Sequence, residues 1–133
     1  MILQYEATKI LRQLNDDRPL CIGHSGVCLF LRTVEDANLL RVSSTIYEGH
    51  SYIPRKVRES LSFPSLFSHS LPSFFSIEEE HYRILLHHQQ PMEPLEEGLL
   101  AHLLDQFALL SHQWQDHLED QDRDDRVFIW HKR

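Results

Sequence analysis

The pattern of hydrophobic and polar positions is clearest between Leu95 and Leu118. Large apolar side chains recur there at spacings of three and four residues, which places them on one side of an α-helix. These positions are Leu100, Leu103, Phe107, Leu110 and Trp114, with Leu99, Leu104, Ala108 and Leu118 widening the stripe. We expect the inner positions to lie in a core. For Trp114 and Leu118 a core position and a contact with a partner protein both stay open.

The first third of the chain predicts one helix followed by strands. The apolar periodicity of Ile2–Leu14 favours a helix, and Leu20–Val34 reads as a hairpin with its turn at His24-Ser25-Gly26. A third strand is predicted over Leu39–Tyr47. Three antiparallel strands in sequence order are the simplest arrangement of these segments.

The middle of the chain is less regular. A short helix is predicted to start at Pro54, and Pro64 is expected to end it. The Ser- and Phe-rich residues 63–76 form either a loop over the core or an apolar surface patch, and residues 77–80 form a turn or the edge of one. Alternation of apolar and polar residues returns over His81–Gln90 and predicts a further strand.

These elements predict an α+β fold, an antiparallel β-sheet flanked by helices. Their order is α-β-β-β-α-β-(β)-α, with a long C-terminal helix. We assign residues 1–120 to a single domain, since 133 residues are enough to bury a core. Residues 121–133 are assigned to a C-terminal tail, which is acidic at first and then apolar and basic.

Charge and composition exclude several classes of protein. The net charge is −7, and residues 93–125 contain ten Asp or Glu against one Arg, which argues against direct binding of nucleic acid. No segment is apolar for long enough to span a membrane, and the N-terminus does not read as a secretion signal. We therefore expect a cytoplasmic protein. Cys21 and Cys28 are then expected to be reduced, partly buried thiols.

The sequence carries no recognisable catalytic or metal-binding motif. The ten histidines show no zinc spacing, and although His102 and Asp105 are close enough on a helix to share a metal, no further ligand accompanies them. No nucleophile elbow and no Gly-rich phosphate loop is present. We predict a protein that is not an enzyme and that holds no cofactor and no metal.

The second half of the chain resembles the class I type III secretion chaperones of the CesT/SycE-like family. The resemblance rests on a strand at Arg83–His88, the turn Pro91-Met92, an acidic helix start at Leu95-Glu96-Glu97, the leucines of Leu99–Leu110, and Trp114. The first helix and the three-stranded segment also lie where the family has them. The resemblance extends over most of residues 1–118.

The resemblance implies a bacterial, non-enzymatic chaperone. Such a protein binds the N-terminal segment of a secreted effector or gatekeeper protein and keeps it export-competent, using apolar grooves and an added strand. It implies a homodimer or a heterodimer with a second chaperone. A transcription regulator that contacts RNA polymerase or a regulatory factor through the acidic helix and the Trp130 tail is the alternative.

Two sets of residues are predicted to make these contacts. The candidates for client binding are Phe30, Leu31 and Leu40. The candidates for a partner or dimer interface are Val57, Leu61, Phe63, Trp114, Leu118, Phe128 and Trp130.

Overall fold

The computed structural model describes residues 4–36, 38–63, 66–67, 71–93 and 95–131. Its elements are α1 (Gln4–Asn15), β1 (Leu20–His24), β2 (Val27–Val34), β3 (Leu39–Glu48), α2 (Arg55–Ser60), β4 (Phe74–Glu78), the 3-10 turn η1 (Glu79–His81), β5 (Arg83–Pro91) and α3 (Glu97–His131). The predicted α+β order is confirmed with both later strands present, and β4 lies in residues that were predicted to form a loop, a surface patch or a turn. Residues 2, 3 and 64, used to predict the ends of two helices, lie outside the described residues.

The five strands form one antiparallel sheet in the order β1-β2-β3-β5-β4. The predicted hairpin is confirmed. Its loop is only Ser25-Gly26, and both residues have positive φ, as a two-residue type I′ turn requires. The first three strands form the predicted meander. After β3 the chain forms α2 and then β4, which is the far edge strand of the sheet. It then returns as β5, which lies between β3 and β4.

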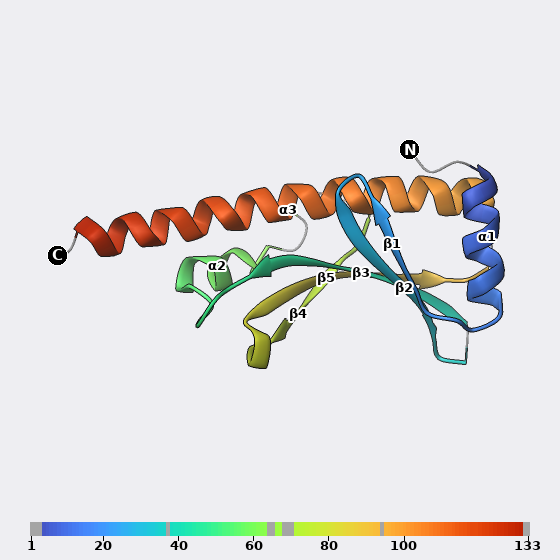
Figure 1. Ribbon diagram of the computed structural model, residues 1–133, viewed down its shortest axis with the longest axis horizontal. Coiled ribbons are helices and arrows are strands. Elements are labelled where there is room, and N and C mark those ends of the chain that lie inside the picture. Colours follow the sequence, from blue (N-terminus) through green and yellow to red (C-terminus); the bar gives the residue numbers. More distant parts are fainter. Residues whose placement is uncertain (1–3, 37, 64–65, 68–70, 94, 132–133) are drawn as a thin grey trace.

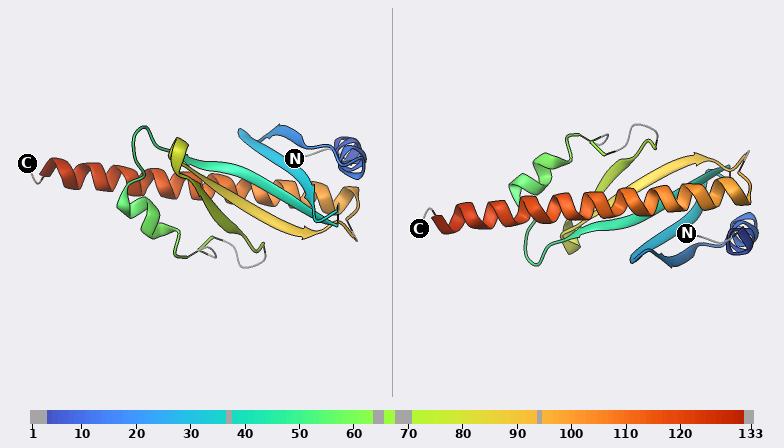
Figure 2. Two further views of the ribbon diagram at one scale, coloured as in Figure 1. Left: turned by 90° about the horizontal axis from the view of Figure 1, so that it is seen from below. Right: turned by 90° about the horizontal axis from the view of Figure 1, so that it is seen from above.

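All of the helices lie on one side of this sheet or at its ends. Figure 1 shows α3 running along the sheet, with α1 across its beginning and α2 beside its later turns. The two views of Figure 2 show strands in front of α3 from one side and α3 in front of the strands from the other. The sheet therefore has a covered face, against α3, and an open face that no described helix covers.

The core lies between the covered face and α3. The strands contribute Leu29, Leu31, Leu40, Val42, Ile46, Ile84 and Leu86, and α3 contributes Leu100, Leu103, Leu104, Phe107, Leu110, Trp114 and Leu118. Burying each of these side chains stabilises the fold by about 1.5–3 kcal/mol. The apolar stripe predicted for the long helix is thus its core face, except that Leu99 is half exposed.

One polar pair lies inside this core. The hydroxyls of Ser44 on β3 and Ser111 on α3 are 2.7 Å apart, and both residues are fully buried. Ser111 donates its proton to the carbonyl oxygen of Phe107 at 2.8 Å. A hydroxyl has one proton, so Ser44 donates to Ser111, and both groups are satisfied without water.

The helix α3 is longer than the sequence predicted. It continues to His131 and therefore includes residues 121–131, which we assigned to a tail. Its later residues contain no proline and no glycine, and Arg123 forms an ion pair of 2.6 Å with Asp120 three residues earlier. Charged residues that favour or tolerate a helix, with such pairs, allow the helix to continue beyond the sheet.

Candidate partner-binding surface

The open face of the sheet carries apolar, aromatic and basic side chains. Along β2 the residues alternate strictly between buried and exposed, so Cys28, Phe30 and Arg32 project from the open face. The cross-strand register extends this face over all five strands. One continuous row across the sheet consists of Cys21, Phe30, Ser43, His87 and Phe74.

His87 organises the middle of this row. Its Nδ1 lies 2.7 Å from Ser43 Oγ, and its Nε2 lies 2.6 Å from Ser76 Oγ. The ring of Phe74 stacks on the imidazole with a centroid distance of 5.0 Å. The imidazole thus links β3, β5 and β4 on the open face and fixes the position of an aromatic ring at the sheet edge.

The basic residues of the open face act on His87. Burial, and then the positive charges of Arg41 and Arg32, lower the pKa of His87 below its ordinary value. Arg41 and Arg32 lie opposite each other in the register, and Arg41 donates two hydrogen bonds to Gln89 Oε1. This part of an otherwise acidic protein is positively charged, which favours contact with an acidic or polar segment of a partner.

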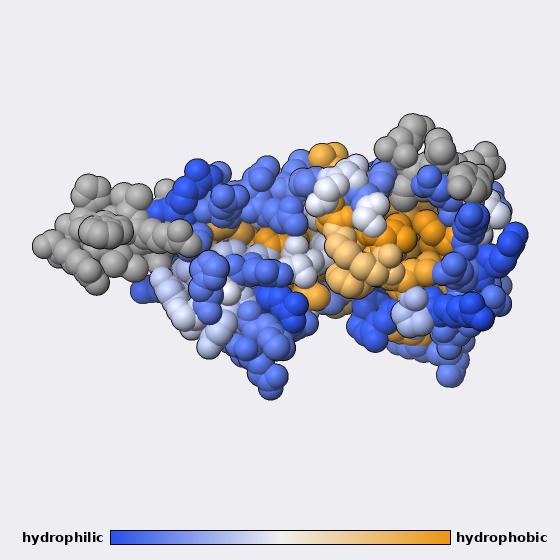
Figure 3. Space-filling view, in the orientation of Figure 1, coloured by the Kyte–Doolittle hydropathy of each residue, from blue (hydrophilic) through white to orange (hydrophobic). Residues whose placement is uncertain are grey.

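The outer edge of the sheet at β1 is the second feature of the surface. Among the described strands β1 pairs only with β2, so its outer backbone groups are available to another strand. Phe30 is 44% exposed beside this edge. Figure 3 shows apolar surface gathered over the β1–β2 hairpin, whereas most of the rest of that side is polar. An edge strand next to an apolar patch is a site where an extended peptide can add to a sheet.

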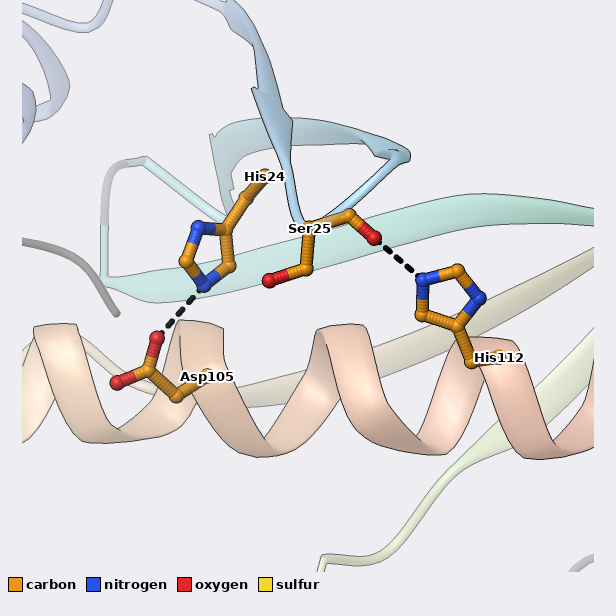
Figure 4. A network of polar contacts seen from close by, with 4 residues as sticks. All are labelled: His24, Ser25, Asp105 and His112. Carbon is orange, nitrogen blue, oxygen red and sulfur yellow. Dashed lines mark hydrogen bonds and ion pairs between the residues drawn. The ribbon is translucent and has the colours of Figure 1, made fainter.

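The hairpin is held to α3 at its turn (Figure 4). His24 Nε2 lies 2.6 Å from Asp105 Oδ1, and the His24 side chain is only 10% exposed. About two turns further along α3, His112 Nε2 donates a hydrogen bond to the carbonyl oxygen of Ser25. These two contacts fix the position of the edge strand relative to the helix.

A second apolar surface lies beside α2. Phe63 is 67% exposed and Leu66 is 49% exposed. They line a shallow groove of about 350 Å³ together with Lys56, Glu59, Ser60, His117 and Gln121. Its lining residues come from α2, the segment after it and α3. Figure 2 shows α2 on the side of the sheet away from β1.

The structure corrects two of the three predicted client-binding residues. Leu31 is 1% exposed and Leu40 is fully buried, because both project from the covered face into the core. Phe30, which lies between Leu29 and Leu31 and points to the other face, is on the surface. It is the only one of the three predicted client-binding residues that is exposed.

The predicted interface residues divide in the same way. Trp114, Leu118 and Val57 are fully buried core residues, and Trp114 is packed edge-to-face against Phe67 and Phe75. Leu61 is partly buried, so only Phe63 presents a large apolar surface. Phe128 and Trp130 are on α3, and their side chains lie outside the described residues. Sequence reasoning did not name Leu66 and Phe74 as candidates. Both lie in the segment 63–76, where apolar residues follow no regular spacing that would show which of them are exposed.

The cysteines are also placed differently from the prediction. Cys21 and Cys28 are both exposed on the open face, not partly buried, and they are free thiols. Within the described residues, no three or more His, Cys, Asp or Glu side chains come close enough to hold a metal ion. None of the helices in the described part of the chain combines the length and apolar character that crossing a bilayer requires.

The fold described here is that of the type III secretion chaperones. A chain of the ExsC–ExsE complex matches it with a TM-score of 0.65 and 14% identity, over 84% of this chain and 95% of that chain. The Yersinia pestis type III secretion chaperone SycH, solved with a stable fragment of YscM2, matches with a TM-score of 0.57 and 12% identity, over 84% and 95% of the two chains. A chain of the heterodimeric ExoU–SpcU complex from the Pseudomonas aeruginosa type III secretion system matches with a TM-score of 0.59 and 18% identity. The match covers 87% of this chain and 96% of that chain.

The sequence itself gives no such match. No family model fits it, and no curated protein matches it. At identities of 12–18%, the structural superposition shows a shared fold and nothing more. The likeness of this chain to the secretion chaperones is therefore a likeness of architecture.

Proposed function

We propose that this protein is a non-enzymatic type III secretion chaperone of the bacterial cytoplasm. It binds the N-terminal segment of a secreted effector or gatekeeper protein and keeps it unfolded for export. The support is the fold, together with the complexes in which its structural neighbours were solved. The observation that carries the proposal is the free β1 edge beside the exposed Phe30.

The surface suits an extended polypeptide better than a small molecule. A client strand that pairs with β1 gains main-chain hydrogen bonds, and its alternate side chains lie over the open face. Phe30 offers an apolar contact there, and Arg32 and Arg41 offer positive charge for an acidic or polar client residue. Because these contacts are made to an unfolded chain, they hold it without requiring a folded partner.

A binding experiment with secreted segments tests this function. The full chain is co-expressed with the N-terminal segments of the secreted proteins encoded in its source genome, and complexes are isolated by size exclusion. We expect one or more segments to co-purify and to be protected from proteolysis. Phe30→Ser is expected to weaken that complex, and Leu109→Ser, which removes an even more exposed apolar side chain from α3, is the control. The proposal fails when no secreted segment binds.

We further propose that the surface beside α2 contacts a second chaperone subunit. Its support is the exposure of Phe63 and Leu66 around a groove that lies away from the β1 edge. A homodimer and a heterodimer are both compatible with an apolar patch of this kind. In either case the client-binding edge stays accessible, because it lies at the other edge of the sheet.

The alternative of a transcription regulator has weaker support. It rests on the acidic composition of α3 and on Trp130, and no structural feature described above favours a polymerase contact. A pull-down with polymerase subunits distinguishes the two functions, because a secretion chaperone retains client segments and not polymerase.

A further inference from the structure

The open face carries a pair of thiols in contact. Cys21 on β1 and Cys28 on β2 have their sulfur atoms 2.7 Å apart, and both side chains are exposed. They are diagonal neighbours, since Cys21 lies opposite Phe30 and Cys28 lies opposite Gly23.

We propose that Cys21 and Cys28 are a peroxide-reactive dithiol that closes to an intramolecular disulfide. A disulfide bond is about 2.05 Å long, so the two sulfurs need to approach by only about 0.7 Å from their contact distance. The type I′ turn between them keeps β1 and β2 in register, so the reduced protein already holds the two thiols together. This inference does not depend on the proposed chaperone function.

The reaction balances with a hydroperoxide as oxidant. One thiolate attacks an oxygen of the peroxide, the O–O bond breaks, and an alcohol or water leaves while the sulfur becomes a sulfenic acid. The second sulfur then attacks the sulfenic sulfur, an S–S bond forms and water leaves. Two thiols and one hydroperoxide thus give one disulfide, one alcohol or water, and one further water. A second thiol at contact distance makes the closing step intramolecular and fast.

The surroundings favour this chemistry over metal binding. Zinc and related metals require about four ligands, and no third ligand accompanies the two thiols among the described residues. The hydrogen bond that Cys28 shares with Cys21, with smaller contributions from burial and from the charge on Cys21, raises the pKa of Cys28 above its ordinary value. A raised pKa leaves less of the Cys28 thiol as thiolate at neutral pH, so disulfide formation should be slow there and should accelerate as the pH rises.

The disulfide would change the edge strand. It would tie β1 covalently to β2 on the open face, while His24 and Ser25 hold the same hairpin to α3 on the other. The pair stands next to Phe30, so oxidation would act on the edge and the apolar patch together.

Thiol titration of the full chain with hydrogen peroxide tests the proposal. The two exposed thiols are expected to disappear together, and the intact mass is expected to fall by two hydrogens. No disulfide-linked dimer is expected to form. Dithiothreitol should restore both thiols. Cys21→Ser and Cys28→Ser are matched variants at exposed positions, so they should fold, and each should give sulfenic acid or an intermolecular disulfide instead.

Two results would overturn it. The first is loss of one thiol while the other remains titratable in the wild-type chain. The second is accumulation of sulfenic acid in the wild-type chain as in either serine variant, which would show that the neighbouring sulfur does not close the disulfide. Loss of both thiols together without accumulated sulfenic acid, in the wild-type chain only, would support the dithiol.

Discussion

His24 Nε2 lies 2.6 Å from Asp105 Oδ1, and this contact joins the first hairpin to a helix that begins far later in the chain. The two residues are 81 positions apart, so the contact exists only because the sheet and α3 pack together. Because its acceptor is a carboxylate, the hydrogen bond is charge-assisted whether the imidazole is neutral or protonated. In both states it fixes the turn of the hairpin against α3.

Asp105→Ala is expected to destabilise the protein by about 1–2 kcal/mol, because it leaves the nearly buried imidazole of His24 without its acceptor. Urea denaturation measures the change. Asp116→Ala, on the same helix at an exposed position, is the matched control and should change the stability much less. Equal stabilities for the two variants would show that the contact contributes nothing to the fold.

How much of this fold the sequence predicts depends on the range of the interaction. Local periodicity predicted α1, the hairpin, β3, β5 and the core stripe of α3, because each depends on residues a few positions apart. It also identified Ser25-Gly26 as a turn. The strand β4 was read as part of a loop, surface patch or turn, because the adjacent apolar residues Phe74 and Phe75 break the alternation that marks a strand.

The misassigned site residues have a different cause. Alternation along β2 shows that two faces exist, but it does not say which of them α3 covers. Phe30 and Leu31 are both large and apolar, so both were predicted on the surface. The residues that share a face with each of them could have decided it. Arg32 and Cys28 lie on the face of Phe30, whereas the apolar Val27 and Leu29 lie on the face of Leu31.

The length of α3 escaped prediction because its later half has no apolar stripe to mark it. Charged residues and pairs such as Asp120–Arg123 stabilise the helix there, and they produce no apolar periodicity in the sequence. The sequence left Trp114 open between a core position and an interface position. Its burial depends on Phe67 and Phe75, which come from a distant segment of the chain.

The buried serine pair gives a second prediction. Ser111→Ala removes the acceptor of the Ser44 hydroxyl and leaves a buried donor unpaired, so it should cost about 1–3 kcal/mol. Ser44→Ala should cost less, because Ser111 keeps its bond to the Phe107 carbonyl. The double variant should lose less stability than the sum of the two single variants. Chemical denaturation of the four proteins measures the cycle, and strict additivity would contradict the pairing.

The exposed Phe63 gives a third prediction. Phe63→Asp should shift the protein towards the monomer, because it puts a charge into the proposed subunit contact beside α2. Light scattering of the purified chain, alone and with a candidate partner chaperone, measures the mass. Leu109→Asp places the same charge at a similarly exposed site on α3 and should leave the mass unchanged. Dissociation by both variants, or by neither, would argue against an interface at Phe63.

The open face should also make the stability depend on pH through His87. Burial and the charges of Arg41 and Arg32 lower the pKa of this imidazole in the folded state, so near and below pH about 6.5 the unfolded chain binds more protons than the folded one. Folding stability therefore falls as the pH drops through that range and is regained as the pH rises. His87→Gln removes the titrating group. The melting temperature of the variant should decline less between about pH 7 and pH 5 than that of the wild type.

The slope of this decline, and not the absolute stability, is the readout, because His87→Gln also removes the hydrogen bonds to Ser43 and Ser76. His102→Gln alters an exposed histidine on α3 and is the control, so its pH profile should run parallel to that of the wild type. If His87→Gln also runs parallel to the wild type, protonation of the open face does not weaken the fold. A reduced slope for His87→Gln alone would show that the folded state lowers the pKa of His87, through burial and then the charges of Arg41 and Arg32, where the client is proposed to bind.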